Sequence, residues 1–295
     1  MAKKDTTKTA RLEEIANELE KINTRTELEG CSGLDDMMQA VIEHLLIAMF
    51  PYHFDDEQGR FEETEKRTYH LMNASYILNR ALSHIFDGDE ARATAATDEF
   101  LDSLVGILEL IKTDVQAGYE GDPAAKSVDE VILTYPAFKG IAIYRLAHKL
   151  YEMQIPLVPR IMSEYAHRIT GIDIHPGAKI GPYFFIDHGT GVVVGETCTI
   201  GEHCKLYQHV TLGAKSFDLN DDGTPVKGVK RHPDLGDRVV VYSGASILGG
   251  NTRIGDDCIV GGNVWLTHSL EAGEAIVNNP SGQEIRKVGS DLKGE

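Results

Sequence analysis

The stretch IDHGTG at residues 186–191 places a carboxylate, Asp187, beside an imidazole, His188, with glycines close behind. It interrupts a run in which aliphatic residues recur every six positions. Histidine ordinarily titrates near pH 6.5, so it can take a proton from a hydroxyl near neutral pH. A carboxylate on the other ring nitrogen would fix the tautomer and stabilise the imidazolium. His188 is therefore a candidate general base.

The run that holds this stretch has a six-residue period. Aliphatic residues fall six apart between Ile174 and Leu266, with shifts of phase near Val192 and Gly249, and glycine often follows them. A period of six fits neither an α-helix nor one long strand. It fits short strands joined by corners and wound into a coil whose aliphatic residues point inward. The pattern predicts a parallel β-helix.

The first part of the chain has a different pattern. Apolar residues recur three to four apart, as at Leu12, Ile15 and Leu19, which predicts amphipathic helices. We therefore expect an all-helical N-terminal domain over residues 1–170. A β-helix over 171–270 with a long polar loop at 213–233 and a C-terminal tail over 271–295 would follow it.

Composition narrows the class of protein. The 295 residues carry a net charge of −17, which argues against a nucleic-acid surface. No apolar run approaches about twenty residues, and the N-terminus has no apolar signal-peptide core, so we expect no membrane span and a cytoplasmic location. Four cysteines without CxxC spacing are expected to be reduced thiols: Cys31, Cys198, Cys204 and Cys258.

Several segments together resemble the serine O-acetyltransferases, a family of hexapeptide-repeat acyltransferases. They are GDPAA, YPAFKGIAIYRLAHKLY, DIHPGAKIGPYFFIDHGTGVVVGET and KRHPDL, and the resemblance runs from about Asp122 to Leu266. It implies a left-handed β-helix and an enzyme that moves an acetyl group from acetyl-CoA to the hydroxyl of L-serine. The product would be O-acetyl-L-serine for cysteine biosynthesis, formed without a metal.

The resemblance also implies roles for individual residues. His188 matches the general base, and Asp173 of DIHP matches its carboxylate partner. They lie fifteen residues apart, and one coil takes roughly eighteen, so we expect them on adjacent coils.

The acceptor would be held by two further pairs. Asp122 and Asp187 match the carboxylates that meet the serine ammonium group, and Arg231 and His232 match the residues that meet its carboxylate. His232 is expected to reach a site formed mainly by a neighbouring subunit.

Acetyl-CoA is implied by the family alone, because the chain has neither a P-loop nor a dinucleotide-binding fingerprint. We expect it along the loop and the last coils, at Gly213, Gly244, Ala245 and Gly262. Lysines that could meet its phosphates are Lys215, Lys227, Lys230 and Lys287, none favoured over another.

The family implies a homo-oligomer, a trimer or a dimer of trimers, and L-cysteine could act as a feedback inhibitor because it mimics serine. Three features depart from the family pattern: the long 213–233 loop, an extra residue at Gly249–Gly250, and the final residue, Glu295. Members that dock onto cysteine synthase end in isoleucine, so we expect weak or no complex by that route.

Three alternatives remain. A hexapeptide O-acetyltransferase for a sugar would not need the acidic pair Asp122 and Asp187. A non-catalytic β-helix subunit would have no use for the motif set. A zinc-dependent hydratase would need three imidazoles, whereas only His203 and His209, six apart, could stack on one face. We expect these two to be surface residues.

Overall fold

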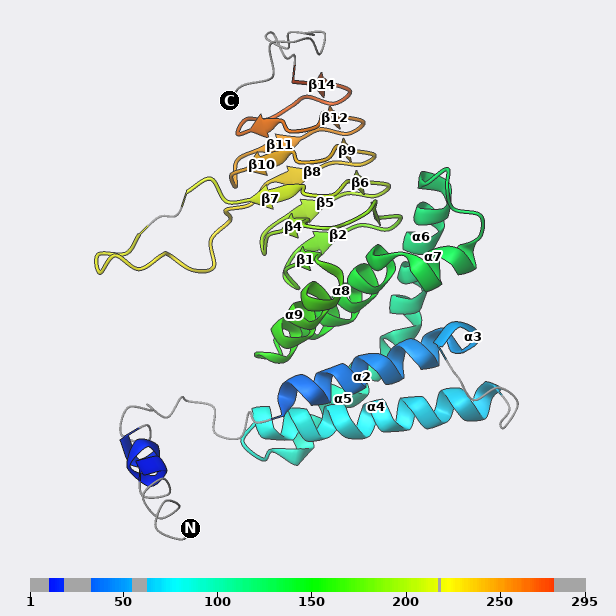
Figure 1. Cartoon of the computed structure of the whole chain (residues 1–295), viewed down its shortest axis with the longest axis vertical. Helices are drawn as coiled ribbons and strands as arrows, with labels where there is room; N and C mark the ends of the chain where they lie inside the picture. The colour runs from blue at the N-terminus through cyan, green and yellow to red at the C-terminus, as the bar shows by residue number, and fades with distance from the viewer. Residues whose placement is uncertain (1–10, 19–32, 55–62, 217–218, 279–295) are drawn as a thin grey trace, which may run out of the picture.

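The computed structural model describes residues 11–18, 33–54, 63–216 and 219–278 (Figure 1). The helices after residue 32 are α2 (Leu34–Met49), α3 (Pro51–Phe54), α4 (Glu63–Ile85), α5 (Glu90–Asp102), α6 (Leu104–Gly121), α7 (Val128–Thr134), α8 (Pro136–Glu152) and α9 (Val158–Thr170). Within these ranges, no helix has the length and apolar content needed to cross a membrane.

The strands that follow are short and all pair in parallel. They are β1 (Asp173–Ile174), β2 (Lys179–Ile180), β3 (Phe185–Ile186), β4 (Val193–Val194), β5 (Thr199–Ile200), β6 (Lys205–Leu206), β7 (Thr211–Gly213), β8 (Asp234–Leu235), β9 (Val240–Val241), β10 (Ser246–Leu248), β11 (Arg253–Ile254), β12 (Ile259–Val260), β13 (Trp265–Leu266) and β14 (Ala275–Ile276). The predicted fold class, a helical part followed by a left-handed parallel β-helix, is confirmed.

From β1 to β13 successive strands belong to successive sheets, so three hexapeptides complete one coil of a triangular prism. The first sheet is β1-β4-β7-β10-β13, the second β2-β5-β8-β11, and the third β3-β6-β9-β12-β14. The aliphatic residue of each repeat points inward, and Ile174, Ile186 and Leu206 are buried in one continuous core. The six-residue period thus corresponds to one inward side chain for each side of the prism.

The coil turns at three edges. The His188 edge joins the third sheet to the first and comprises residues 187–192, 207–210, 242–245 and 261–264. The loop edge joins the first to the second and comprises residues 175–178, 195–198, 214–233 and 249–252. The third edge comprises residues 181–184, 201–204, 236–239 and 255–258. Figure 1 shows the loop of the loop edge reaching away from the prism.

Helix α8 closes the open end of the prism. Ala137, Ile141 and Tyr144 lie about one helical turn apart and pack into the prism core, while the other face of α8 packs among the helices. The hydroxyl of Tyr144 donates to the Ala178 carbonyl at 2.6 Å. Arg145 is buried, donates to the Gly181 carbonyl and pairs with Asp114 of α6. These contacts fix the helical part onto the first coil.

The end of α6 also approaches the prism closely. A Cβ atom at Gly121 would lie 2.9 Å from the ring of Phe185 on β3, and one at Gly118 would lie 3.5 Å from it. Only a residue without a side chain permits this approach. It brings Asp122, the residue after α6, to the coil that carries Asp187 and His188.

Three of the cysteines, Cys198, Cys204 and Cys258, are free and buried in the prism core, as expected. Burial raises the pKa of the Cys198 thiol to about 12 and that of Cys204 to about 11, so both are unreactive thiols. Cys31 lies outside the described residues. So do Lys287 and Glu295, and the expectations that rest on them stay predictions.

Candidate active site

Asp122 is held rigidly at the end of α6. Its Oδ2 atom accepts a hydrogen bond of 2.5 Å from the hydroxyl of Tyr135, and its Oδ1 atom accepts one from the backbone N–H of Ala124. The Tyr135 hydrogen bond, followed by the Ala124 bond and the charges of Lys205 and His188, lowers the pKa of Asp122. Asp122 is therefore an ionised carboxylate near His188.

The second predicted carboxylate lies beside the candidate base. Asp187 is buried, and its Oδ1 atom lies 3.8 Å from Nε2 of His188. The side chain of His188 is 72% exposed at the corner of the His188 edge, where its backbone has φ 60°. The structure thus brings Asp122, Asp187 and His188 together from two parts of the chain.

A lysine that the sequence analysis did not consider completes this cluster. Nζ of Lys205 lies 3.0 Å from Oδ2 of Asp187 and donates to the Gly121 carbonyl at 2.8 Å. Burial alone would lower the pKa of Lys205, but contacts with Tyr207 and Asp187 raise it above its ordinary value. Lys205 is a fixed cation between the two carboxylate-bearing segments.

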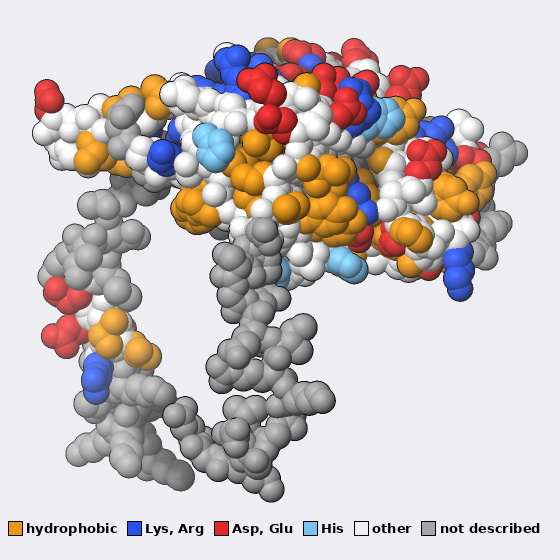
Figure 2. All heavy atoms as spheres, turned by 90° about the horizontal axis from the view of Figure 1, so that it is seen from above, with side chains coloured by type: hydrophobic (Ala, Val, Ile, Leu, Met, Phe, Trp, Pro, Cys, Tyr) orange, Lys and Arg blue, Asp and Glu red, His pale blue; other side chains and the backbone are white. Residues whose placement is uncertain are grey.

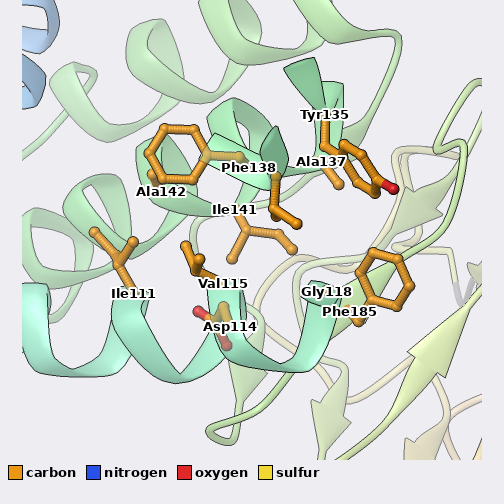
Figure 3. A pocket seen from close by; sticks show the side chains of 11 residues that line it. Ile111, Asp114, Val115, Gly118, Tyr135, Ala137, Phe138, Ile141, Ala142 and Phe185 are labelled. Carbon is orange, nitrogen blue, oxygen red and sulfur yellow. The ribbon is translucent and has the colours of Figure 1, made fainter. Parts of the chain in front are cut away.

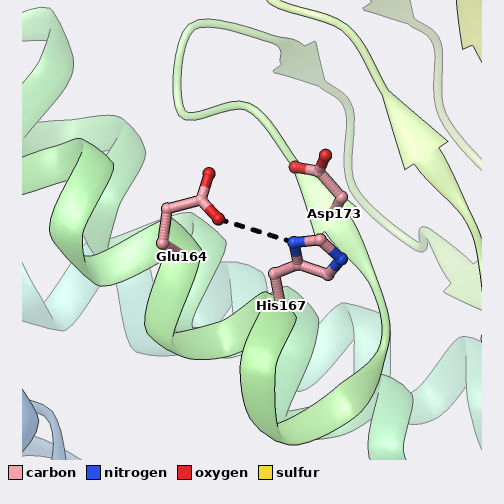
Figure 4. A group of neighbouring side chains, drawn as sticks. All are labelled: Glu164, His167 and Asp173. Atoms are coloured by element: carbon pink, nitrogen blue, oxygen red, sulfur yellow. Dashed lines mark ion pairs between the residues drawn. The ribbon is translucent and has the colours of Figure 1, made fainter.

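Asp173 begins β1, which pairs with β4 beyond the His188 corner, but its carboxylate faces a different histidine. Its carboxylate groups with Glu164 and His167 of α9, with potential ligand atoms within 4.8 Å of one another (Figure 4). Within the described residues no hydrogen bond or ion pair joins Asp173 to His188. Burial raises the pKa of Asp173. The predicted Asp173–His188 partnership stays a prediction.

The cluster in Figure 4 offers one imidazole and two carboxylates, with Glu164 and His167 exposed and Asp173 half-buried. Glu164 and His167 are i,i+3 neighbours on α9 with a separation of 3.5 Å, an ordinary arrangement on a helix surface. Exposed acidic groups are common without an ion, so the cluster carries no argument for a metal.

Arg231 and His232 lie on the loop edge, not on the His188 edge. The guanidinium of Arg231 donates to Glu196 at 2.5 Å, and the hydroxyl of Tyr151 donates to the same carboxylate. Burial alone would raise the pKa of Glu196, but these two hydrogen bonds hold it below its ordinary value. Arg231 therefore already has a carboxylate partner within its own chain.

His232 and His175 lie together on this edge as neutral rings. Nδ1 of His232 accepts the N–H of Thr197 at 3.1 Å, and Nδ1 of His175 accepts the N–H of Gly177 at 3.0 Å. Burial lowers the pKa of each ring to about 4. This geometry gives His175 a structural role at its coil corner.

The four residues expected near acetyl-CoA divide between two edges. Gly213 lies where the chain enters the loop edge, whereas Gly244, Ala245 and Gly262 lie on the His188 edge. A Cβ atom at Gly244 would lie 2.3 Å from Oδ1 of Asn263, and the backbone there has φ 73°, so glycine is favoured at this position. A Cβ atom at Gly213 would lie 2.9 Å from a terminal methyl group of Leu248, which a small side-chain shift would relieve.

Ala245 points into the core. Its backbone N–H donates to the Tyr242 carbonyl, and its carbonyl accepts from the N–H of Thr211. With its side chain buried and its backbone paired, Ala245 offers no group to bind a cofactor and could only bound the site on one side.

The long loop encloses a cleft of about 310 Å³ against the last coils. Lys215, Lys230 and Arg231 line it from the loop, and Gly249 to Thr252 line it from the prism. A Cβ atom at Gly250 would lie 2.6 Å from the Lys230 carbonyl, so the absence of a side chain at Gly250 gives room for the returning loop. Lys230 itself is paired with Asp234.

A second pocket lies under Tyr135 and is too small for a ligand. It has a volume of about 10 Å³ and is lined mainly by apolar side chains such as Val115, Phe138 and Ile141 (Figure 3). A space of this size holds one water molecule at most. Its wall supports Tyr135 and Phe185, which flank the Asp122 and Lys205 contacts.

The expectation that His203 and His209 could stack on one face is wrong. His203 lies on the third edge, where its ring stacks on Tyr183 at 4.3 Å, and His209 lies on the His188 edge. Residues one hexapeptide apart occupy successive sides of the prism, and only residues about three hexapeptides apart share an edge. The geometry that suggested a three-imidazole zinc site is therefore absent for this pair.

Sequence reasoning missed three residues of the site: Tyr135, Glu196 and Lys205. Tyr135 and Glu196 stand inside the quoted motifs YPAFKG and VGET, but their partners are remote in the sequence. Lys205 is the outward residue of an ordinary repeat, so its position carries no signal.

Comparison with known proteins gives concordant results. The chain is 44% identical over 251 residues to a plasmid serine acetyltransferase of Synechococcus elongatus, covering 80% of this chain and 78% of that relative. It is 37% identical to a solved serine acetyltransferase isoform 3 of Entamoeba histolytica in complex with cysteine, with a TM-score of 0.75 and 84% of each chain covered.

A Neisseria gonorrhoeae serine acetyltransferase solved with serine is 25% identical, with a TM-score of 0.55, over 83% of this chain and 96% of that one. No family model matches the chain.

Proposed function

We propose that this chain, which belongs to the serine acetyltransferase family, transfers the acetyl group of acetyl-CoA to the hydroxyl of L-serine. The product is O-acetyl-L-serine, an intermediate of cysteine biosynthesis. Family membership rests on the 44% identical relative, of which the chain covers 78%, and makes the chain an acyltransferase.

The observation that carries the acceptor assignment is the cluster of Asp122, Asp187 and His188. Asp122, whose pKa is lowered, and a second carboxylate, Asp187, lie beside an exposed imidazole and suit an acceptor that has an ammonium group next to a hydroxyl. A neutral sugar has no group that would use both carboxylates. The cluster therefore supports serine over the alternative acceptor, a sugar or another hydroxylated compound.

In the proposed reaction, His188 removes the hydroxyl proton as the serine oxygen attacks the thioester carbonyl. The tetrahedral intermediate then expels the CoA thiolate, which takes the proton from the His188 imidazolium. Asp187 and Asp122 hold the ammonium group, and Asp173 supports the imidazolium by its charge from the adjacent coil. Each proton and electron pair is accounted for without a metal.

The co-substrate would lie along the His188 edge. Gly244 and Gly262 have no side chains of their own on that edge, and the cationic loop residues Lys215, Lys227 and Lys230 would suit its phosphates if a loop edge lay alongside. Acetyl-CoA supplies the activated thioester, while the residues of this chain orient the acceptor and move the proton.

The position of Arg231 and His232 supports a site shared between subunits. Both lie on the loop edge, whereas the base lies on the His188 edge of the same prism. In a trimer of prisms, the loop edge of one chain would lie beside the His188 edge of the next, and Arg231 and His232 would meet the serine carboxylate there.

Exposed hydrophobic side chains on the prism faces support such packing. Trp265 is 72% exposed on the first sheet and Ile259 is 41% exposed on the third. Seen from above, hydrophobic side chains lie between charged ones over the described surface (Figure 2). A trimer, or a dimer of trimers through the helical part, would cover part of this surface.

Two further parts of the proposal concern regulation and location. L-cysteine has the ammonium and carboxylate groups of serine, so it would bind to the same residues and inhibit the transfer to serine.

The three free thiols suit a reducing compartment, and we place the protein in the cytoplasm, with no nucleic acid and no membrane as partner.

The test is release of free thiol from acetyl-CoA by the purified protein with L-serine, with a simple sugar, and with neither. We expect release that depends on serine and falls by about a hundredfold or more in His188→Asn. Asparagine tolerates the left-handed backbone at this corner, so the fold is preserved. His203→Asn, at an equivalent corner of the third edge, is the matched control and should retain full activity.

Release with the sugar but not with serine would move the acceptor assignment to the alternative. No release with either would favour a non-catalytic β-helix.

A further inference from the structure

Lys205 is held at the acceptor site by contacts on every side. Its ammonium lies 3.0 Å from Asp187, 2.8 Å from the Gly121 carbonyl, 4.4 Å from the ring centre of Tyr207 and 5.0 Å from that of Phe185. Only 17% of its side chain is exposed. A lysine used merely for solubility would extend into solvent and sample many rotamers.

The Gly121 contact places the cation at the carboxyl end of α6. The last carbonyls of a helix lack partners within the helix and carry partial negative charge, so a cation there is stabilised. Gly121 precedes Asp122, and Lys205 also contacts Asp187. One ammonium therefore links the two acceptor carboxylates across the junction between the helical part and the prism.

The charges balance around a single acceptor ammonium. Asp122 and Asp187 are two carboxylates and Lys205 is one cation, so one negative charge remains to meet the acceptor ammonium group. Without Lys205, Asp187 would lose the cation 3.0 Å from its Oδ2 atom, and Asp122 would lose a nearby positive charge that helps to lower its pKa. With Lys205, Asp187 keeps Oδ2 on the lysine and Oδ1 toward His188.

We propose that Lys205 is a positioning residue for acceptor binding, which holds Asp187 and the Asp122 segment in the geometry that receives the serine ammonium group. The inference rests on the proposed function, because it assigns the two carboxylates to that ammonium. Lys205 acts through Asp187 and Asp122, and this role requires no contact between Lys205 and the acetyl donor.

The experiment compares Lys205→Met, Lys205→Arg and Lys179→Met with the wild-type chain by thiol release. Lys179 is the matched control, because it is also the first residue of a two-residue strand in the prism, but it is exposed on the second sheet. We expect Lys205→Met to raise KM for serine about tenfold and to leave KM for acetyl-CoA within about twofold. Lys205→Arg should restore KM for serine to within about threefold, and Lys179→Met should change neither.

An unchanged or lowered KM for serine in Lys205→Met would overturn the proposal, as would an equal rise in both KM values. If Lys205→Met does not fold, Lys205→Arg and Lys205→Gln test the proposal in its place. The arginine variant should keep serine KM low, the glutamine variant should raise it, and equal KM values in the two would refute the role of the charge. Absence of serine-dependent release by the wild-type protein would instead refute the proposed function.

Discussion

The hydroxyl of Tyr135, just before α8, donates a 2.5 Å hydrogen bond to Oδ2 of Asp122, just after α6. This bond raises the pKa of Tyr135 to about 12 and is the main cause of the lowered pKa of Asp122. It fixes the second oxygen of a carboxylate whose first oxygen already accepts the N–H of Ala124. The proposed acceptor site thus depends on a contact made entirely within the helical part.

We predict that Tyr135→Phe raises KM for serine several-fold and leaves KM for acetyl-CoA unchanged. Because the pKa of Asp122 would return toward its ordinary value, the loss of serine binding on acidification should begin at a higher pH than in wild type. Initial rates at varied serine near pH 7 measure the rise in KM for serine. Serine binding measured by calorimetry from about pH 3 to 6, a range that includes the ordinary Asp122 pKa of 3.8, measures the shift. Tyr119→Phe, a tyrosine exposed on α6, is the control, and a pH profile identical to wild type would contradict the role given to Tyr135.

Variants of Asp173 and His167 test which histidine, His188 or His167, the Asp173 carboxylate supports. If Asp173 supports the His188 imidazolium, Asp173→Asn should lower kcat by about a hundredfold, while His167→Asn should leave it within about twofold. The rate of serine-dependent thiol release at saturating substrates measures this. An equal loss in the two variants would mean that Asp173 acts through His167, its neighbour in Figure 4.

His175 and His232 predict a loss of stability in mild acid. Both rings accept backbone N–H groups at Nδ1 and have a pKa of about 4 when folded, below the ordinary 6.5. The unfolded chain therefore binds more protons between these values, so the free energy of unfolding is highest above pH 6.5 and decreases as pH falls toward 4.

Urea unfolding at pH 7, 6 and 5 should show this decrease. It should be smaller in a His175→Asn/His232→Asn double variant, whose amide oxygens can accept the same N–H groups. His268→Asn, at an exposed histidine, is the control and should retain the wild-type slope. An unchanged slope in the double variant would show that other groups cause the acid sensitivity.

The buried ion pair of Arg145 and Asp114 is predicted to stabilise the junction between the helical part and the prism. Burial raises the pKa of Asp114, and Arg145 opposes that effect through a two-point contact at 3.0 Å. Arg145→Met would leave Asp114 buried without a cation, which is expected to lower the free energy of unfolding by about 3–5 kcal/mol.

Thermal and urea unfolding measure the loss. Arg238→Met removes an exposed arginine paired with Asp257 and should change stability little. Equal stability of Arg145→Met and wild type would show that the pair does not anchor α8.

The sequence alone determined the repeat, the class of fold and most of the chemistry. A six-residue aliphatic period admits few structures other than a coil of short strands, because each repeat must supply one inward side chain to each side. The motifs that resemble the family predicted His188 as the base and Asp122 and Asp187 as acceptor carboxylates, since these side-chain types are recognisable without coordinates.

Tertiary structure decided which of these residues meet. Lys205 contacts Gly121, a residue 84 positions away, because the glycine-bearing end of α6 packs against Phe185. The winding of the coil assigns each corner to one edge of the prism. It separates His203 from His209 and leaves Arg231 on a different edge from His188. Neither a period nor a motif contains this information, because it depends on the winding of the coil and on how the helices dock onto its end.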